Sequence, residues 1–190
     1  MTIQHGVTTT TSITGTRPIA TSSSSVIGMI VIAEEANTTT FPEGKAVLIT
    51  DPRAALLDAG GTGTLMPALN AILAQVQAPM VIVRVAEGAD DASTTQNVIA
   101  GIDKLRSAQT QLGVTPRILG IPYLDSQTVT DALLTVAAEL NGFVYASCGS
   151  AAARDDAVSY RANFGQRELM LLWPNFVNGV EEVSAVACAL

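Results

Sequence analysis

Apolar runs and amphipathic segments alternate along the chain from residue 26 onward. The runs at 26–33 (VIGMIVIA) and 80–85 (MVIVRV) are almost wholly apolar, which is typical of strands buried on both faces. The expected strands are 26–33, 46–50, 80–85, 117–121, 143–147 and 168–173. The expected helices are 52–59, 65–77, 93–107, 126–141 and 151–163. This order predicts an α/β fold with a mainly parallel sheet that helices cover on both faces.

Capping residues indicate where several of these helices begin and end. Asp51 before Pro52 fits an N-cap followed by proline at the first helical position, and Gly60 ends that helix. Asp125 is placed to be the N-cap of the helix at 126–141, and Gly142 follows its end. Asp125 also follows a strand. Because parallel sheets bind ligands at the carboxyl ends of their strands, a binding role is the alternative for this residue.

The first 25 residues have a different pattern, rich in Thr and Ser with a period of two. One face of this predicted β-arm carries Ile3, His5, Val7, Thr9, Thr11 and Ile13. The arm either folds back on its own domain, adds to an exposed sheet edge of another chain, or is a polar tail without a fixed structure. We therefore expect an arm and linker at 1–25 and a body at 26–190, either undivided or made of subdomains 26–110 and 111–190.

The last residues keep a helical spacing up to the end of the chain. The apolar positions of this predicted helix are Val180, Val183, Val186, Ala187 and Leu190. No capping residue follows them, so the pattern indicates a body truncated at its C-terminus. A short terminal helix is the alternative.

Composition narrows the class of protein. Apolar residues make up 48% of the 190 positions, so the chain has enough apolar surface for a folded core. Charged residues are only 14%, which fits either extensive subunit contacts or a monomer with few charges. A net charge of −7 with ten scattered basic residues argues against nucleic-acid binding. No apolar run is long enough to span a membrane, and the start lacks the pattern of a signal peptide.

Candidate chemical motifs do not form a catalytic or cofactor site. The glycine-rich segment 60–64 lies between two predicted helices, and Met66 stands where a dinucleotide fingerprint needs glycine. His5 is the only histidine, and the two cysteines, Cys148 and Cys188, are distant in sequence, so a zinc site is not expected. The pairs at 90–91 and 155–156 are aspartates near helix starts. We therefore predict no catalytic residue, no cofactor and no metal.

Several blocks resemble the sheath proteins of contractile phage tails and of tailocins, and the last two are the most specific. In chain order they are HGV at 5–7, SVIGM at 25–29, FP at 41–42, AVLIT at 46–50, GTL at 63–65, VIVRV at 81–85, LGVTPRILGIP at 112–122, YRANF at 160–164 and QRELMLLWP at 166–174. Together they extend over nearly the whole chain.

The resemblance implies a structural subunit, not an enzyme. Sheath proteins of this family polymerise as stacked hexameric rings around a tail tube, and contraction drives the tube through the host envelope. The implied partners are further copies of the chain, the tube protein, and the baseplate and terminator proteins, with neither nucleic acid nor membrane. The implied place is the virion tail, assembled in the bacterial cytoplasm. Terminal arms join neighbouring subunits, which assigns the arm residues named above to a subunit interface.

The length of the family also affects this interpretation. Its members are typically about twice as long as this chain, so the chain corresponds to their N-terminal half. The alternatives are the sheath of a related injection device, such as a tailocin or a type VI secretion system, and an α/β ligand-binding domain.

Overall fold

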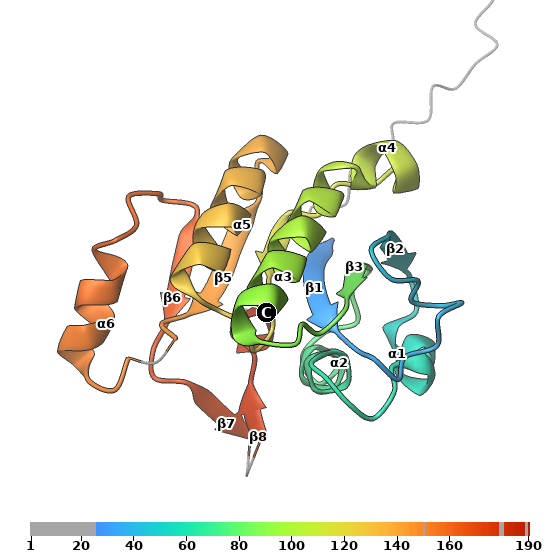
Figure 1. Cartoon of the computed structure of the whole chain (residues 1–190), viewed down its shortest axis with the longest axis horizontal. Coiled ribbons are helices and arrows are strands. Elements are labelled where there is room, and N and C mark those ends of the chain that lie inside the picture. The colour runs from blue at the N-terminus through green and yellow to red at the C-terminus, as the bar shows by residue number, and fades with distance from the viewer. Residues whose placement is uncertain (1–25, 150, 179–180, 189) are drawn as a thin grey trace, which may run out of the picture.

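The body of the protein is a twisted six-stranded sheet between two layers of helices (Figure 1). The computed structural model describes residues 26–149, 151–178, 181–188 and 190. The sheet has the strand order β2-β3-β1-β4-β5-β6, and a separate two-stranded sheet pairs β7 with β8. The strands are β1 (Ile27–Ile32), β2 (Ala46–Ile49), β3 (Met80–Val85), β4 (Ile118–Gly120), β5 (Phe143–Ser147), β6 (Leu169–Leu172), β7 (Phe176–Asn178) and β8 (Glu181–Val183).

The helices follow the strands in the expected alternation. They are α1 (Pro52–Ala55), a 3-10 turn η1 (Leu56–Asp58), α2 (Leu65–Leu73), α3 (Asp91–Arg106), α4 (Ala108–Leu112), α5 (Gln127–Leu140), α6 (Arg154–Arg161) and α7 (Ala185–Cys188). None of the helices in the described part of the chain has the length and apolar run needed to cross a membrane.

The prediction of a mainly parallel α/β sheet is confirmed. Strand β1 lies at the centre and pairs in parallel with β3 on one side and β4 on the other. The pairs β4–β5 and β5–β6 are also parallel, whereas β2 runs antiparallel to β3 and forms one edge. The sheet includes strands from both sides of residue 110.

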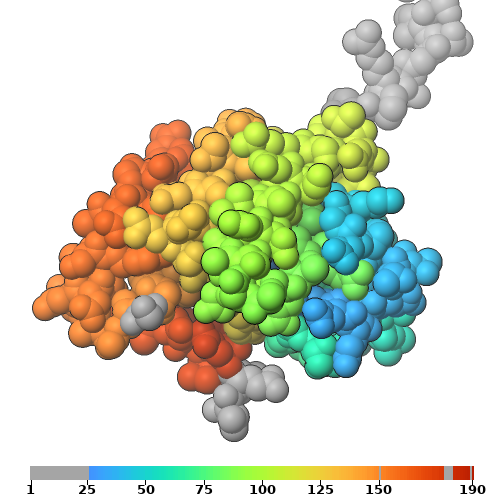
Figure 2. Space-filling model, viewed as in Figure 1, coloured from blue at the N-terminus to red at the C-terminus, as the bar shows by residue number. Residues whose placement is uncertain are grey.

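Alternate side chains of the central strands enter two separate apolar clusters. Ile30 of β1 packs with α3 and α5, which cross the face turned to the viewer in Figures 1 and 2. Ile27 and Met29 lie on the opposite face with α2 and α7. Every residue of β1 and β3 is buried, which explains why their sequences are continuously apolar apart from Arg84.

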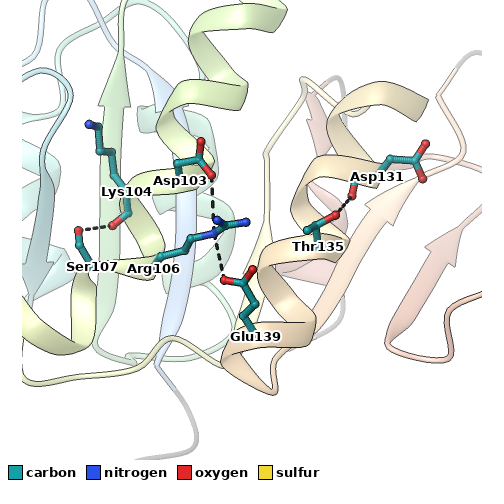
Figure 3. Close-up of polar contacts among 7 residues, drawn as sticks. All are labelled: Asp103, Lys104, Arg106, Ser107, Asp131, Thr135 and Glu139. Carbon is teal, nitrogen blue, oxygen red and sulfur yellow. Dashed lines mark hydrogen bonds and ion pairs between the residues drawn. The ribbon is translucent and has the colours of Figure 1, made fainter.

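Polar contacts join the two helices of the first layer at the surface. The Arg106 Nε of α3 lies 3.1 Å from a Glu139 carboxylate oxygen of α5 and 3.7 Å from one of Asp103 (Figure 3). Both acids are largely exposed, so these pairs orient the helices at the surface and contribute little to stability.

The predicted caps are confirmed at Asp51 and wrong at Asp125. The Asp51 side chain accepts hydrogen bonds from the backbone N–H groups of Arg53 and Ala54. The N-cap of α5 is instead Ser126, whose hydroxyl accepts from the Val129 N–H at 3.3 Å. Asp125 points across to the next strand and accepts a hydrogen bond from the Ser147 N–H at 2.9 Å. The sequence has two adjacent capping residues, and tertiary contacts decide which one caps the helix.

The predicted C-terminal helix is wrong in its first half. Strands β7 (Phe176–Asn178) and β8 (Glu181–Val183) pair antiparallel as a hairpin, and among the described residues after Trp173 only Ala185–Cys188 are helical. Val183 pairs with Phe176 across the hairpin, while Val186 and Ala187 enter the core. A spacing of three residues between valines fits either a helix or a bent strand-to-helix segment, so periodicity could not separate the two.

Candidate functional site

The surface offers sheet edges and exposed apolar side chains. Strands β2 and β6 form the two edges of the main sheet, and no further strand pairs with β6 among the described residues. Large exposed apolar side chains gather near the β6 end of the molecule. They are Val158 of α6, Met170 of β6, Trp173, and Phe176 and Val177 of β7. Exposed edges and apolar patches of this kind are typical of surfaces that bind another chain.

The hairpin β7–β8 carries two of these exposed apolar side chains. It projects from the lower edge of the molecule in Figure 1. Phe176 is 52% and Val177 63% exposed. The Tyr123 hydroxyl donates to the Glu182 carbonyl oxygen at 3.0 Å and ties the hairpin to the loop after β4. Behind it, Val186 of α7 packs directly on Gly120, where a larger residue would collide with it.

A polar cavity of about 520 Å³ lies between this hairpin and the carboxyl ends of β4 and β5. Asp125 follows β4, Ser147 ends β5, and Glu182 and Ser184 come from the hairpin side. The first residues of α5 complete the wall, together with Tyr160 of α6. The cavity therefore brings together four segments that are distant in sequence.

Asp125 is the most perturbed carboxylate of the cavity. Desolvation raises its pKa to about 6, the hydrogen bonds from Ser147 oppose the shift, and the negative charge of Glu182 adds to it. Part of the residue is exposed, but its carboxyl group is enclosed. Burial also raises the pKa of the Tyr160 phenol and of the Cys148 thiol, with a further contribution from Asp125. At neutral pH this site therefore holds an ionised carboxylate in an unfavourable environment.

We expect Asp125→Asn to raise the free energy of unfolding at pH 7.5 by about 1 to 2 kcal/mol. A carboxyl group whose pKa is higher in the folded state stabilises the fold below its unfolded pKa, and this stabilisation is lost as the pH rises through about 6. Urea denaturation at pH 5 and pH 7.5 measures the effect. The variant should lose less stability between the two pH values than the wild type; a variant less stable than the wild type at pH 7.5 would contradict this.

The other candidate groups have structural roles. Segment 60–64 is the predicted turn between helices, since it links η1 to α2. Thr64, the last residue of this segment, lies beside the end of β1 and donates its N–H to the Ile32 carbonyl oxygen at 2.8 Å. Cys148 is buried, and a raised pKa disfavours its nucleophilic thiolate form.

The aspartate pairs lie at helix starts, as predicted. The Asp90 side chain accepts from the Ser93 N–H at 2.7 Å, and that of Asp156 from the Ala153 N–H at 3.1 Å. Within the described ranges, no group of three or more His, Cys, Asp and Glu side chains is placed to hold a metal ion. The predicted arm residues Ile3, His5, Val7, Thr9, Thr11 and Ile13 lie outside the described residues.

Comparison with known proteins finds phage tail sheath proteins among the relatives of this chain. The sequence is 38% identical over 200 residues to the tail sheath protein of Escherichia phage P2, an alignment that covers 97% of the chain and 50% of the phage protein. The major tail sheath protein of Serratia phage KSP20 is 40% identical over 185 residues, or 88% of the chain and 47% of that protein. The chain is homologous to phage tail sheath proteins. No family model matches it.

This sheath homologue spans about half the length of the relatives it matches. Solved structures share its fold at low sequence identity. A chain in the contracted baseplate of the anti-feeding prophage matches with a TM-score of 0.65 and 14% sequence identity. A chain in the contracted helical sheath of the anti-feeding prophage matches with a TM-score of 0.58 and 17% sequence identity. Each match covers the whole of this chain and 54% and 51% of the solved chains.

The cavity and the hairpin are the features of this sheath homologue that the sequence did not predict. Asp125 follows a predicted strand, but no feature of the sequence places Glu182 and Ser184 beside it. Residues 175–178 (NFVN) before Gly179 carry a strand and turn signal that could have indicated the hairpin.

Proposed function

We propose that the chain forms part of a structural, non-enzymatic subunit of a contractile tail sheath, which polymerises around a tail tube and contracts to drive it through the host envelope. The observation that supports this most is the 38% identity to the phage P2 tail sheath protein over 97% of the chain. The proposed partners are further copies in stacked hexameric rings, the tube protein, and the baseplate and terminator proteins. The proposed place is the virion tail, after assembly in the bacterial cytoplasm.

A sheath of a related injection device is the second candidate. The fold shared with the helical sheath of the anti-feeding prophage favours it. Both candidates use the same physical parts: a rigid body that can move as a unit and a connection that survives the movement. Residues 26–190 would supply the body and residues 1–25 the connecting arm and linker.

The arm is proposed to add a strand to a neighbouring subunit, with Ile3, Val7 and Ile13 on the packing face. The hairpin β7–β8 has the properties of an acceptor. A two-stranded sheet has little stability alone and gains from a third strand. Phe176 and Val177 are exposed beside its edge and offer apolar surface to the arm. Low charge at the surface, 14% over the chain, also favours contacts between copies.

Replacing Ile3 and Ile13 by Asp tests the arm. The two charges would have to be buried against the neighbouring sheet, so we expect the variant to remain monomeric where the wild type associates. Sedimentation velocity over the accessible concentration range, followed by negative-stain electron microscopy, measures the assemblies. The matched control replaces Thr8 and Thr10 by Asp, which adds the same charge to the opposite face of the arm and should leave association intact.

Two results would overturn the proposal. Assembly of the Ile3→Asp, Ile13→Asp variant to the same extent as the wild type would remove the arm from the interface. A wild-type chain that stays monomeric at every concentration, beside a longer sheath product that forms tubes, would place the lattice contacts outside these 190 residues.

A further inference from the structure

We propose that the cavity at the carboxyl ends of β4 and β5 is a binding site for an ammonium or guanidinium group. The cavity has a volume of about 520 Å³, enough for the end of a lysine or arginine side chain or for a small aliphatic amine. Such a group would bind whether or not the chain assembles into a sheath.

The charges around the cavity have one sign. Asp125 and Glu182 are its carboxylates, and its lining contains neither Lys nor Arg. No basic side chain lies within 4 Å of either carboxylate among the described residues. The other titratable groups of the cavity and around Asp125 are the Tyr123 and Tyr160 phenols and the Cys148 thiol, none of which carries a positive charge. An enclosed carboxylate without a cationic partner is costly, and a bound cation removes that cost.

A buried hydroxyl in the same wall provides a second, independent observation. Ser184 is 3% exposed and lines the cavity, and its Oγ has no hydrogen-bond partner in the described part of the chain. Buried polar groups in folded proteins nearly always have a partner, so the polar groups of this wall are incompletely paired. The Ser184 Oγ has almost no accessible surface, so its side chain would have to rotate toward the cavity to accept from a bound N–H donor, whereas the carboxylates can accept directly.

The start of α5 does not convert the cavity into an anion site. The amino end of a helix favours negative charge, and Ser126 and Gln127 of this helix end line the wall. Asp125 already supplies that negative charge, and the Ser126 hydroxyl accepts from the Val129 N–H. An added anion would meet both carboxylates, whereas a cation meets complementary charge.

Titration of the chain with agmatine tests the site. This probe carries a guanidinium at one end and an ammonium at the other. At pH 7.5 we expect saturable shifts of the Ser147 and Ser184 amide resonances in NMR spectra of the ¹⁵N-labelled chain. At pH 5 the affinity should fall about tenfold, because Asp125 with a pKa of about 6 is then mostly protonated. Glutarate, a dianion of similar length, should produce no saturable shift.

Matched variants separate the site from general attraction to an acidic protein. Asp125→Asn should abolish binding and Glu182→Gln should weaken it, while Asp155→Asn, which removes an exposed carboxylate of α6, should bind agmatine as the wild type does. Since Asp125→Asn is expected to be at least as stable as the wild type, its loss of binding would not result from unfolding. Equal affinity of Asp125→Asn and wild type, or the absence of saturable shifts at pH 7.5, would overturn the proposal.

The same titration distinguishes two sources of the cation. If agmatine dissociates assemblies of the chain and Asp125→Asn fails to form them, the natural occupant is a Lys or Arg side chain of a second copy. If agmatine binds while the sedimenting mass is unchanged, the site takes a free amine. Both results support the cation site, and only the first connects it with assembly.

Discussion

Replacing Gly63 by Ala is expected to lower the free energy of unfolding by about 3 to 5 kcal/mol. Gly63 has a φ of +87°, a conformation that costs any residue with a Cβ atom. A Cβ at this position would overlap the carbonyl oxygen of Ile32 and lie 2.8 Å from its carbonyl carbon. Both are backbone atoms of the central strand.

The turn around Gly63 cannot easily move away from that strand. The next residue, Thr64, donates its N–H to the same Ile32 carbonyl at 2.8 Å, and its hydroxyl accepts from the Ile32 N–H at 3.0 Å. A shift that relieved the overlap would break these bonds at the buried end of β1. Backbone strain and the loss of these hydrogen bonds would therefore both lower the free energy of unfolding.

Gly113→Ala is the matched control. Gly113 has a similar φ of +72° but no atom within 4 Å of the added Cβ, so only the backbone cost of about 1 kcal/mol remains. Urea denaturation of both variants and the wild type measures the difference. Equal losses for the two variants would mean that backbone conformation, not contact with β1, makes glycine necessary at position 63.

Leu69→Ala is expected to cost about 2 to 5 kcal/mol, because it leaves a cavity between α2 and the sheet. Leu69 is fully buried in the cluster that contains Met29 and Met80, and close-packed helices and strands relax little around a missing side chain. The same denaturation experiment measures the loss.

Leu57→Ala provides the reference for this second variant. Leu57 is 90% exposed in η1, so its truncation should change stability by less than about 0.5 kcal/mol. If Leu57→Ala were as damaging as Leu69→Ala, the surface around η1 would be covered by a contact between copies of the chain. Unchanged stability of Leu69→Ala would contradict the packing of α2 against the sheet.

The main elements could be predicted because burial on both faces leaves a strong signal in the sequence. The apolar runs that form β1 and β3 can bury the side chains of both faces only inside a sheet that helices cover on both sides. Amphipathic spacing likewise located α3 and α5 within one or two residues of their ends. The antiparallel direction of β2 could not be predicted, since the sequence of a short apolar strand fits parallel and antiparallel pairing equally well.

The candidate sites were less predictable because they depend on contacts between distant segments. Asp125 and Ser126 are both good capping residues, and only the position of Ser147 shows why Ser126 caps α5 and Asp125 turns away. Glu182 reaches the same cavity through a hairpin that resembled a helix in sequence. The interface role of the arm remains a prediction that rests on family resemblance, since residues 1–25 lie outside the described part of the chain.

The central position of β1 also has a consequence for biosynthesis. Ile27 pairs with Met80 and Ile118, so this strand must wait for about 90 further residues before both of its edges are satisfied. At about 5 to 20 residues per second, translation exposes a wholly apolar segment for several seconds on the ribosome. Chaperones that bind emerging apolar segments would therefore protect β1 until the residues of β3 and β4 have been made.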